Sequence, residues 1–268
     1  MVWTLGEMTG LYEQIEWFAA HGFTGVDFHA QPNFGLPWAT FDPRDASEAE
    51  VARLARALES FSEVGIHGES FAYDIKLCSP NELVREASVE SLRPSLELAS
   101  SVGAKTVTYH IGKADAQWAH AQLREAFARS LDQLDGMAMQ TGVTVGIEND
   151  VGFEDYIDLV LDAGPGIGMT LDTGHAAMAD GACYRHFGSL GNLIRHVGDR
   201  LVHVHVHDYD GTNDHQAIGT GRVDWADLCT ALREIHYCGM LCMEYNPSRT
   251  RPEDYIEGHR RLEEYLQA

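Results

Sequence analysis

The sequence predicts a single α/β domain folded as a closed (β/α)8 TIM barrel. First, short apolar runs alternate with longer amphipathic runs along all 268 residues, which indicates repeated strand–helix units and a parallel sheet. Second, no low-complexity linker or change of composition interrupts residues 1–268, and eight such units in one domain of this length imply closure into a barrel. Third, ionisable residues recur where the expected strands end, which is where such barrels carry their active sites.

Eight strands are expected, each followed by a helix. The strands are expected near Val2–Leu5, Thr24–His29, Gly65–Ser70, Thr106–Ile111, Thr144–Asn149, Gly168–Thr173, Val202–Asp208 and Met240–Tyr245. The helices are expected at Leu11–Ala20, Glu48–Val64, Asn81–Val102, Ala116–Gln140, Glu154–Ala163, Tyr184–Val197, Trp225–Ile235 and Pro252–Leu266. In the third helix, Ser79 is the expected N-cap, Pro80 and Glu82 fit its first turn, and Pro94 is expected to cause a kink.

The stretch "LVHVHVHDYD" alternates valine with histidine, so one face of this strand is valine and the other is imidazole. Four other expected strands repeat this parity, with apolar residues on one face and an ionisable residue at the end of the other. Those ionisable residues are His110, Glu148, Asp172 and Glu244. We expect the apolar face to pack beneath the helices and the ionisable face to point into the barrel mouth.

Two glutamates, one aspartate and at least one histidine should therefore converge. Like charges gather in a confined site only when something neutralises them, and a divalent cation does so. A mixed carboxylate and imidazole set suits Mn²⁺, Mg²⁺, Co²⁺ or Zn²⁺. Of the histidines on the strand, His203 is expected to fill the barrel, and His207 to contact a neighbour or the substrate.

The charge and the cysteine content of the chain argue against some classes of function and location. The chain has 41 acidic and 19 basic residues, a formal charge of −22, which repels phosphate backbones and makes nucleic acid an unlikely general partner. No stretch approaches the roughly 20 apolar residues of a membrane span. The five cysteines show no CxxC spacing, and no secretory segment is recognisable, so reduced thiols and a cytoplasmic location are expected.

These motifs resemble the xylose isomerase-like TIM barrel superfamily, which holds sugar isomerases and epimerases as well as the endonuclease IV apurinic endonucleases (family 2). "IEN" carries Glu148, "LDTGHA" carries Asp172 and His175, and His205 stands three residues before Asp208. The segment "DHQAIGTGRVDW" and the strand-eight glutamate complete the resemblance. It implies that one divalent metal is bound by four ligands: Glu148, Asp172, His205 and Glu244.

The resemblance implies a metal-dependent sugar isomerase or epimerase of carbohydrate metabolism, acting on a small polyhydroxy carbonyl compound such as a ketose or keto-polyol. The hypothesis is a metal-stabilised enediolate, with Glu148 and Glu244 as the acid/base pair. His29, Trp38 and Phe71 are expected to wall the pocket. By analogy with other barrels of this kind, the chain can also form a homo-oligomer.

The alternative is an endonuclease IV-like zinc phosphodiesterase acting on abasic DNA, with up to three zinc ions. Asn213 stands where that branch has an aspartate, and the charge of −22 favours a small polyol. A non-catalytic metal- or sugar-binding barrel is a third possibility. The residues proposed as further metal ligands or substrate contacts are His67, His110, His175, His207 and His215.

Overall fold

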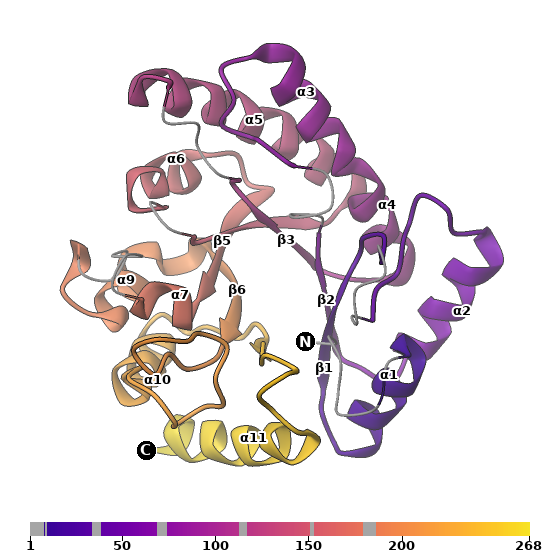
Figure 1. Cartoon of the computed structure of the whole chain (residues 1–268), viewed down its shortest axis with the longest axis vertical. Coiled ribbons are helices and arrows are strands. Elements are labelled where there is room, and N and C mark those ends of the chain that lie inside the picture. The colour runs from indigo at the N-terminus through magenta and orange to yellow at the C-terminus, as the bar shows by residue number, and fades with distance from the viewer. Residues whose placement is uncertain are drawn as a thin grey trace.

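In the part of the chain that the structure describes, seven parallel strands form the centre of the fold, and the helices lie around them (Figure 1). This computed structural model describes residues 8, 10–33, 39–68, 74–112, 117–150, 153–178 and 186–268. The strands hydrogen-bond in sequence order, each parallel to the next, as in a TIM barrel. The predicted α/β class and the parallel barrel of strands with outer helices are confirmed.

The strands correspond to the second through eighth expected ones, and the first, Val2–Leu5, lies outside the described residues. They are β1 (Gly25–His29), β2 (Glu63–His67), β3 (Thr106–His110), β4 (Thr144–Glu148), β5 (Ile167–Asp172), β6 (Leu201–Val206) and β7 (Leu241–Met243).

The two edge strands of the described sheet approach each other through a methionine. A Cβ on Gly25 of β1 would lie 2.4 Å from Met240 Sδ, and one on Gly65 of β2 would lie 3.1 Å from Met240 Cε. The two glycines therefore leave room for the side chain that precedes β7. The sheet curls so that its last strand comes back to its first.

Most helices of the described residues lie between successive strands along the chain. The helices are α1 (Leu11–Ala20), α2 (Glu48–Leu58), α3 (Glu82–Ser91), α4 (Arg93–Val102), α5 (His120–Thr141), α6 (Ile157–Asp162), α7 (Thr173–Ala177), α9 (Leu190–Val197), α10 (Trp225–Glu234) and α11 (Pro252–Gln267). Short 3₁₀ turns occur at Phe153–Asp155 and Gly198–Arg200. Among the helices of the described residues, none combines the length and apolar character that a bilayer span requires.

The region expected as one kinked helix, Asn81–Val102, is two helices. The helix α3 ends at Ser91 and α4 begins at Arg93, with Pro94 in its first turn. Proline has no N–H for an interior helical bond and clashes with the preceding turn, so it starts a new helix here instead of bending one. The predicted N-cap Ser79 is also wrong.

The N-cap of α3 is Asn81, whose side chain accepts a hydrogen bond from Leu83 N at 3.2 Å. Ser79 Oγ accepts from Asn81 N, also at 3.2 Å, so it shapes the turn before the helix. Pro80 therefore precedes the helix, and Glu82 is its first residue rather than the closing residue of a capping box.

The strand parity agrees with the prediction. Val107, Ile147, Met169 and Val204 are buried in the apolar layer, which the helices cover. The residues of opposite parity are ionisable at the carboxyl ends of the strands. Because parallel strands end at the same side of a barrel, this parity places the ionisable side chains together.

Candidate metal and catalytic centre

The strand register brings the predicted site residues to one end of the barrel. His110 pairs with Glu148 across β3 and β4, and Asp172 pairs with His205 across β5 and β6. His205 also pairs with Cys242 on β7, so Glu244 lies two residues further toward the mouth on the same parity. The side chains of all these ionisable residues are buried.

Glu148 is surrounded by imidazoles. Its Oε1 accepts a hydrogen bond from His205 Nδ1 at 2.9 Å, and its Oε2 lies 3.1 Å from His110 Nε2 and 3.3 Å from His67 Nε2. Burial alone would raise the pKa of Glu148, but His110 and His205 hold this pKa well below its usual range. The carboxylate therefore remains ionised at neutral pH.

Glu244 approaches the same histidine. Its Oε2 is 3.0 Å from His205 Nδ1, so this nitrogen contacts both glutamates. Burial alone would raise the pKa of Glu244, yet His205 keeps this pKa well below the usual range. Conversely, burial would lower the pKa of His205, but Glu148 and Glu244 raise it well above that of free histidine. Glu148 and Glu244 thus keep His205 protonated, at a point where the two carboxylates could instead bind a cation.

Asp172 ends β5 and caps α7. Its Oδ1 accepts from His175 N at 2.7 Å, and its Oδ2 accepts from His207 Nε2 at 2.7 Å. Asn149 clamps the Asp172 backbone by accepting from its N–H at 2.7 Å and donating to its carbonyl at 3.0 Å. Burial would lower the pKa of His175, but the Asp172 and Glu148 carboxylates raise that pKa to about 9.

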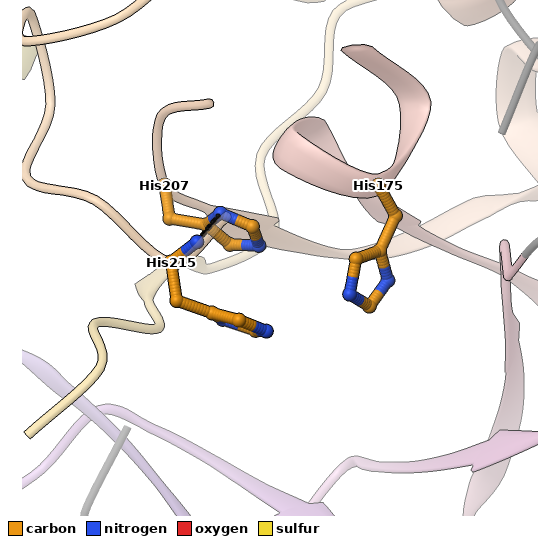
Figure 2. Close-up of side chains that lie close together, drawn as sticks. All are labelled: His175, His207 and His215. Atoms are coloured by element: carbon orange, nitrogen blue, oxygen red, sulfur yellow. Dashed lines mark hydrogen bonds between the residues drawn. The ribbon is translucent and has the colours of Figure 1, made fainter. Parts of the chain in front are cut away.

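Three histidines lie close together, His175, His207 and His215 (Figure 2), and Asp172 contacts the first two of them. The rings of His207 and His215 stack with centroids 4.1 Å apart, and His175 meets His215 edge-on at 5.3 Å. His207 Nδ1 accepts from the backbone N–H of His215 at 2.8 Å, the dashed contact in Figure 2. His215 has a left-handed φ of 51°, which a non-glycine residue adopts only where its surroundings stabilise it.

A buried aspartate fixes the loop that carries His215. The Asp208 carboxylate accepts hydrogen bonds from Gly219 N (2.9 Å), Val223 N (3.0 Å) and Trp225 Nε1 (3.1 Å). His215 Nδ1 in turn donates to the Glu244 carbonyl at 3.0 Å. Asp208 therefore stabilises the conformation of the loop. Within that loop, His215 is held by its hydrogen bond to the backbone of Glu244.

The donor set fits a divalent cation. Several groups of side chains place one donor atom each within 4.8 Å of one another. These groups include His67, His110 and Glu148; His67, His205 and Glu244; Asp172, His207, His215 and Glu244; His175, His207 and His215; and Asp27, His203 and His205. The groups that combine imidazole with carboxylate suit Mn²⁺, Co²⁺ or Zn²⁺. The predicted ligand set remains a prediction. Glu148, His205 and Glu244 meet at His205 Nδ1, whereas Asp172 contacts His175 and His207.

The sequence profile described as "Xylose isomerase-like TIM barrel" matches residues 15–265. The chain belongs to this family. Solved structures similar to it include a D-tagatose 3-epimerase-like protein, with a TM-score of 0.77, 23% identity, and coverage of 97% of this chain and 96% of that one. Another is a D-psicose 3-epimerase with D-tagatose from Clostridium cellulolyticum H10, with a TM-score of 0.76, 17% identity, and coverage of 98% and 96%. At these identities the likeness shows the fold alone.

A curated relative comes from the other branch of the family. It is named "Probable endonuclease 4", from Streptomyces avermitilis, and is 31% identical over 209 residues, covering 69% of this chain and 65% of the relative. The resemblance to the xylose isomerase-like superfamily, with its sugar-enzyme and endonuclease branches, is therefore confirmed.

Some residues of this centre were missed from the sequence. His203 is buried as expected, but its Nε2 lies 3.1 Å from Asp27 Oδ2 on β1, so it does more than fill space. The alternation in "GVDFH" puts Asp27 on the same parity as His29 and could have found it. Asp214 was also missed as a neighbour, since its Oδ2 is 3.9 Å from both His175 Nε2 and His215 Nε2.

Of the expected pocket walls, only one can be placed. His29 is buried with its ring centroid 4.8 Å from that of His67. Burial and the neighbouring His67 lower the pKa of His29 to about 3, so its ring is neutral. Trp38 and Phe71 lie outside the described residues.

Proposed function

We propose that the protein is a divalent-metal-dependent epimerase or isomerase of a ketose or related keto-polyol. One observation carries the proposal: two buried glutamates from β4 and the end of β7 converge on one nitrogen, His205 Nδ1, at 2.9 and 3.0 Å. Two ionised carboxylates that meet at one point suit the removal of a proton and its return.

The proposed metal ligands are Glu148, Asp172, His205 and Glu244. A divalent cation bound there supplies Lewis acidity for a carbonyl oxygen and the neighbouring hydroxyl oxygen. The raised pKa of His205 and of His175 supports this choice, because the metal-free carboxylates already hold protons on the imidazoles in place of a cation.

The glutamates perform the proton transfers. One carboxylate removes the proton from the carbon next to the carbonyl, giving an enediolate, and the other carboxylate returns a proton. Return to the opposite face of the same carbon inverts it, which is epimerisation. Return to the adjacent carbon, with transfer of the hydroxyl proton to the former carbonyl oxygen, exchanges aldose and ketose. Histidines around the mouth, such as His67 and His215, orient the substrate hydroxyls by hydrogen bonds.

Substitution of each glutamate tests the proposal. Glu148→Gln and Glu244→Gln should each lower turnover of a ketose with Mn²⁺ by roughly 10²–10⁴-fold, the usual contribution of a positioned acid or base. Glu244→Gln should keep part of the Mn²⁺ affinity. Glu257→Gln, on the exposed face of α11, is the matched control and should behave as wild type. Near-normal turnover in Glu244→Gln would refute the two-glutamate scheme.

A second function is an endonuclease IV-like phosphodiesterase. It is favoured by the extra donor group of His67, His110 and Glu148, and by the approach of Asp214 to two histidines in the loop where Asn213 is neutral. The relative named "Probable endonuclease 4" supports it as well. Metal analysis of purified protein separates the two: one ion per chain favours the sugar enzyme, and three ions with cleavage of an abasic oligonucleotide favour the nuclease.

A further inference from the structure

A buried carboxylate lies against the far side of His205. Asp27, on β1, places its Oδ2 3.1 Å from His203 Nε2 and 3.9 Å from His205 Nε2, and all three side chains are buried. Within the described residues, neither Asp27 oxygen accepts a well-formed hydrogen bond. A buried carboxylate is costly unless a cation or donor compensates it, so its place between two imidazoles requires a reason.

The two nitrogens of His205 face different carboxylates. Nδ1 points to Glu148 and Glu244, the proposed acid/base pair, at 2.9 and 3.0 Å. Nε2 points the other way, toward Asp27. A histidine that binds a metal through one nitrogen keeps a proton on the other, and a carboxylate that accepts this proton fixes the ring and raises its basicity.

We propose that Asp27 is a positioning residue that holds His205 with its Nδ1 directed at the metal and its Nε2–H directed inward. This inference rests on the proposed function, since it assigns His205 as a ligand. His203 completes the arrangement: its Nε2 lies nearer to Asp27 than His205 does, so it anchors the carboxylate on β1 against β6.

The same three side chains could instead bind a cation of their own, since their donor atoms lie within 4.8 Å of one another. One feature favours the positioning role. A cation there would require His205 to bind metals through both nitrogens, with its ring deprotonated. A proton on His205 Nε2, facing the Asp27 carboxylate at 3.9 Å, makes no such requirement.

The wild-type protein allows a direct test. In the Zn²⁺-loaded protein, long-range ¹H–¹⁵N spectra should show His205 with a proton on Nε2 and a metal-shifted Nδ1, assigned by the loss of these signals in His205→Gln. A proton on Nδ1 with the metal on Nε2 would overturn the assignment. This measurement needs no substitution at Asp27 and reports the tautomer, which a merely structural role does not set.

Substitution provides the second test. Asp27→Asn keeps the shape and removes the charge, and it should weaken Mn²⁺ binding about 10- to 100-fold at unchanged stoichiometry, as for other carboxylates behind a ligating histidine. Asp135→Asn is the control, because its carboxylate bonds Gly166 N outside the barrel, and it should bind Mn²⁺ as wild type does.

The outcomes separate this inference from the proposed function. Unchanged Mn²⁺ affinity in folded Asp27→Asn overturns the role of Asp27 alone. If Asp27→Asn loses one ion per chain and binds the others as before, Asp27 is itself a metal ligand. That outcome also overturns its positioning role. If the wild-type protein binds no Mn²⁺, both the proposed function and the positioning role of Asp27 are overturned.

Discussion

Metal binding at this centre should release protons into solution. The pKa of His175 is about 9, because the Asp172 and Glu148 carboxylates outweigh the effect of burial. A group with that pKa is roughly 99% protonated at pH 7. The pKa of His205 is also raised well above the usual value, by Glu148 and Glu244, so both imidazoles carry a positive charge in the metal-free protein.

The number of protons follows from these contacts. His205 ligates a cation only as a neutral ring, so its bond to Glu148 must give up one proton. A cation held by Glu148 and Asp172 also cancels the negative charge that keeps His175 protonated. We therefore expect about one to two protons per Mn²⁺ at pH 7, and an affinity that rises roughly tenfold per proton for each pH unit.

Calorimetry measures this number directly. Mn²⁺ is titrated at pH 7 in two buffers that differ in ionisation enthalpy, and the difference in heat gives the protons released. His175→Gln is the matched variant and should lower the number by up to one proton while the contribution of His205 remains. Release of no protons, or an affinity that falls as pH rises from 6 to 8, would refute the reasoning.

Three further changes test other parts of the structure. In Gly174→Ala, the new Cβ would lie 2.0 Å from His207 Cε1, so the His207 ring must move away from Asp172. We expect turnover to fall at least about tenfold in steady-state assays. Unchanged turnover would contradict this expectation. Tyr109→Phe removes buried hydrogen bonds to Ser95 Oγ and the Leu92 carbonyl, and should cost about 1–3 kcal/mol in urea unfolding at unchanged Mn²⁺ affinity. Asp208→Asn weakens the anchor of the loop that carries His215, so KM should rise more than kcat falls, and an equal effect on both would argue against a role in binding.

The strand ends could be predicted because strand parity is a local property. Side chains alternate across any strand, so Glu148, Asp172 and Glu244 share a face whatever else surrounds them. At Pro94 the sequence predicts an interruption of the helix, but not that the chain forms two separate helices there. Proline disfavours a helix interior, but whether the chain bends there or starts a new helix depends on how α4 packs, which the local sequence does not specify.

The contacts across the barrel could not be predicted in the same way. The approach of Asp27 to His203 joins the first and sixth strands of the described sheet, and only closure of the barrel brings them together. The place of Asp214 depends on the left-handed backbone of His215, an uncommon conformation that its hydrogen bonds to His207 and Glu244 stabilise. Such tertiary contacts have no signal in a single stretch of sequence.

The most direct test of the proposed chemistry is hydrogen exchange at carbon. The Mn²⁺-loaded protein is incubated in D₂O with a panel of ketoses, and deuterium at the carbon next to the carbonyl is followed by NMR and mass spectrometry. We expect incorporation by the wild type and loss of incorporation in Glu148→Gln or Glu244→Gln. Incorporation that is equally fast in both variants, or absent across the panel while abasic DNA is cleaved, would contradict it.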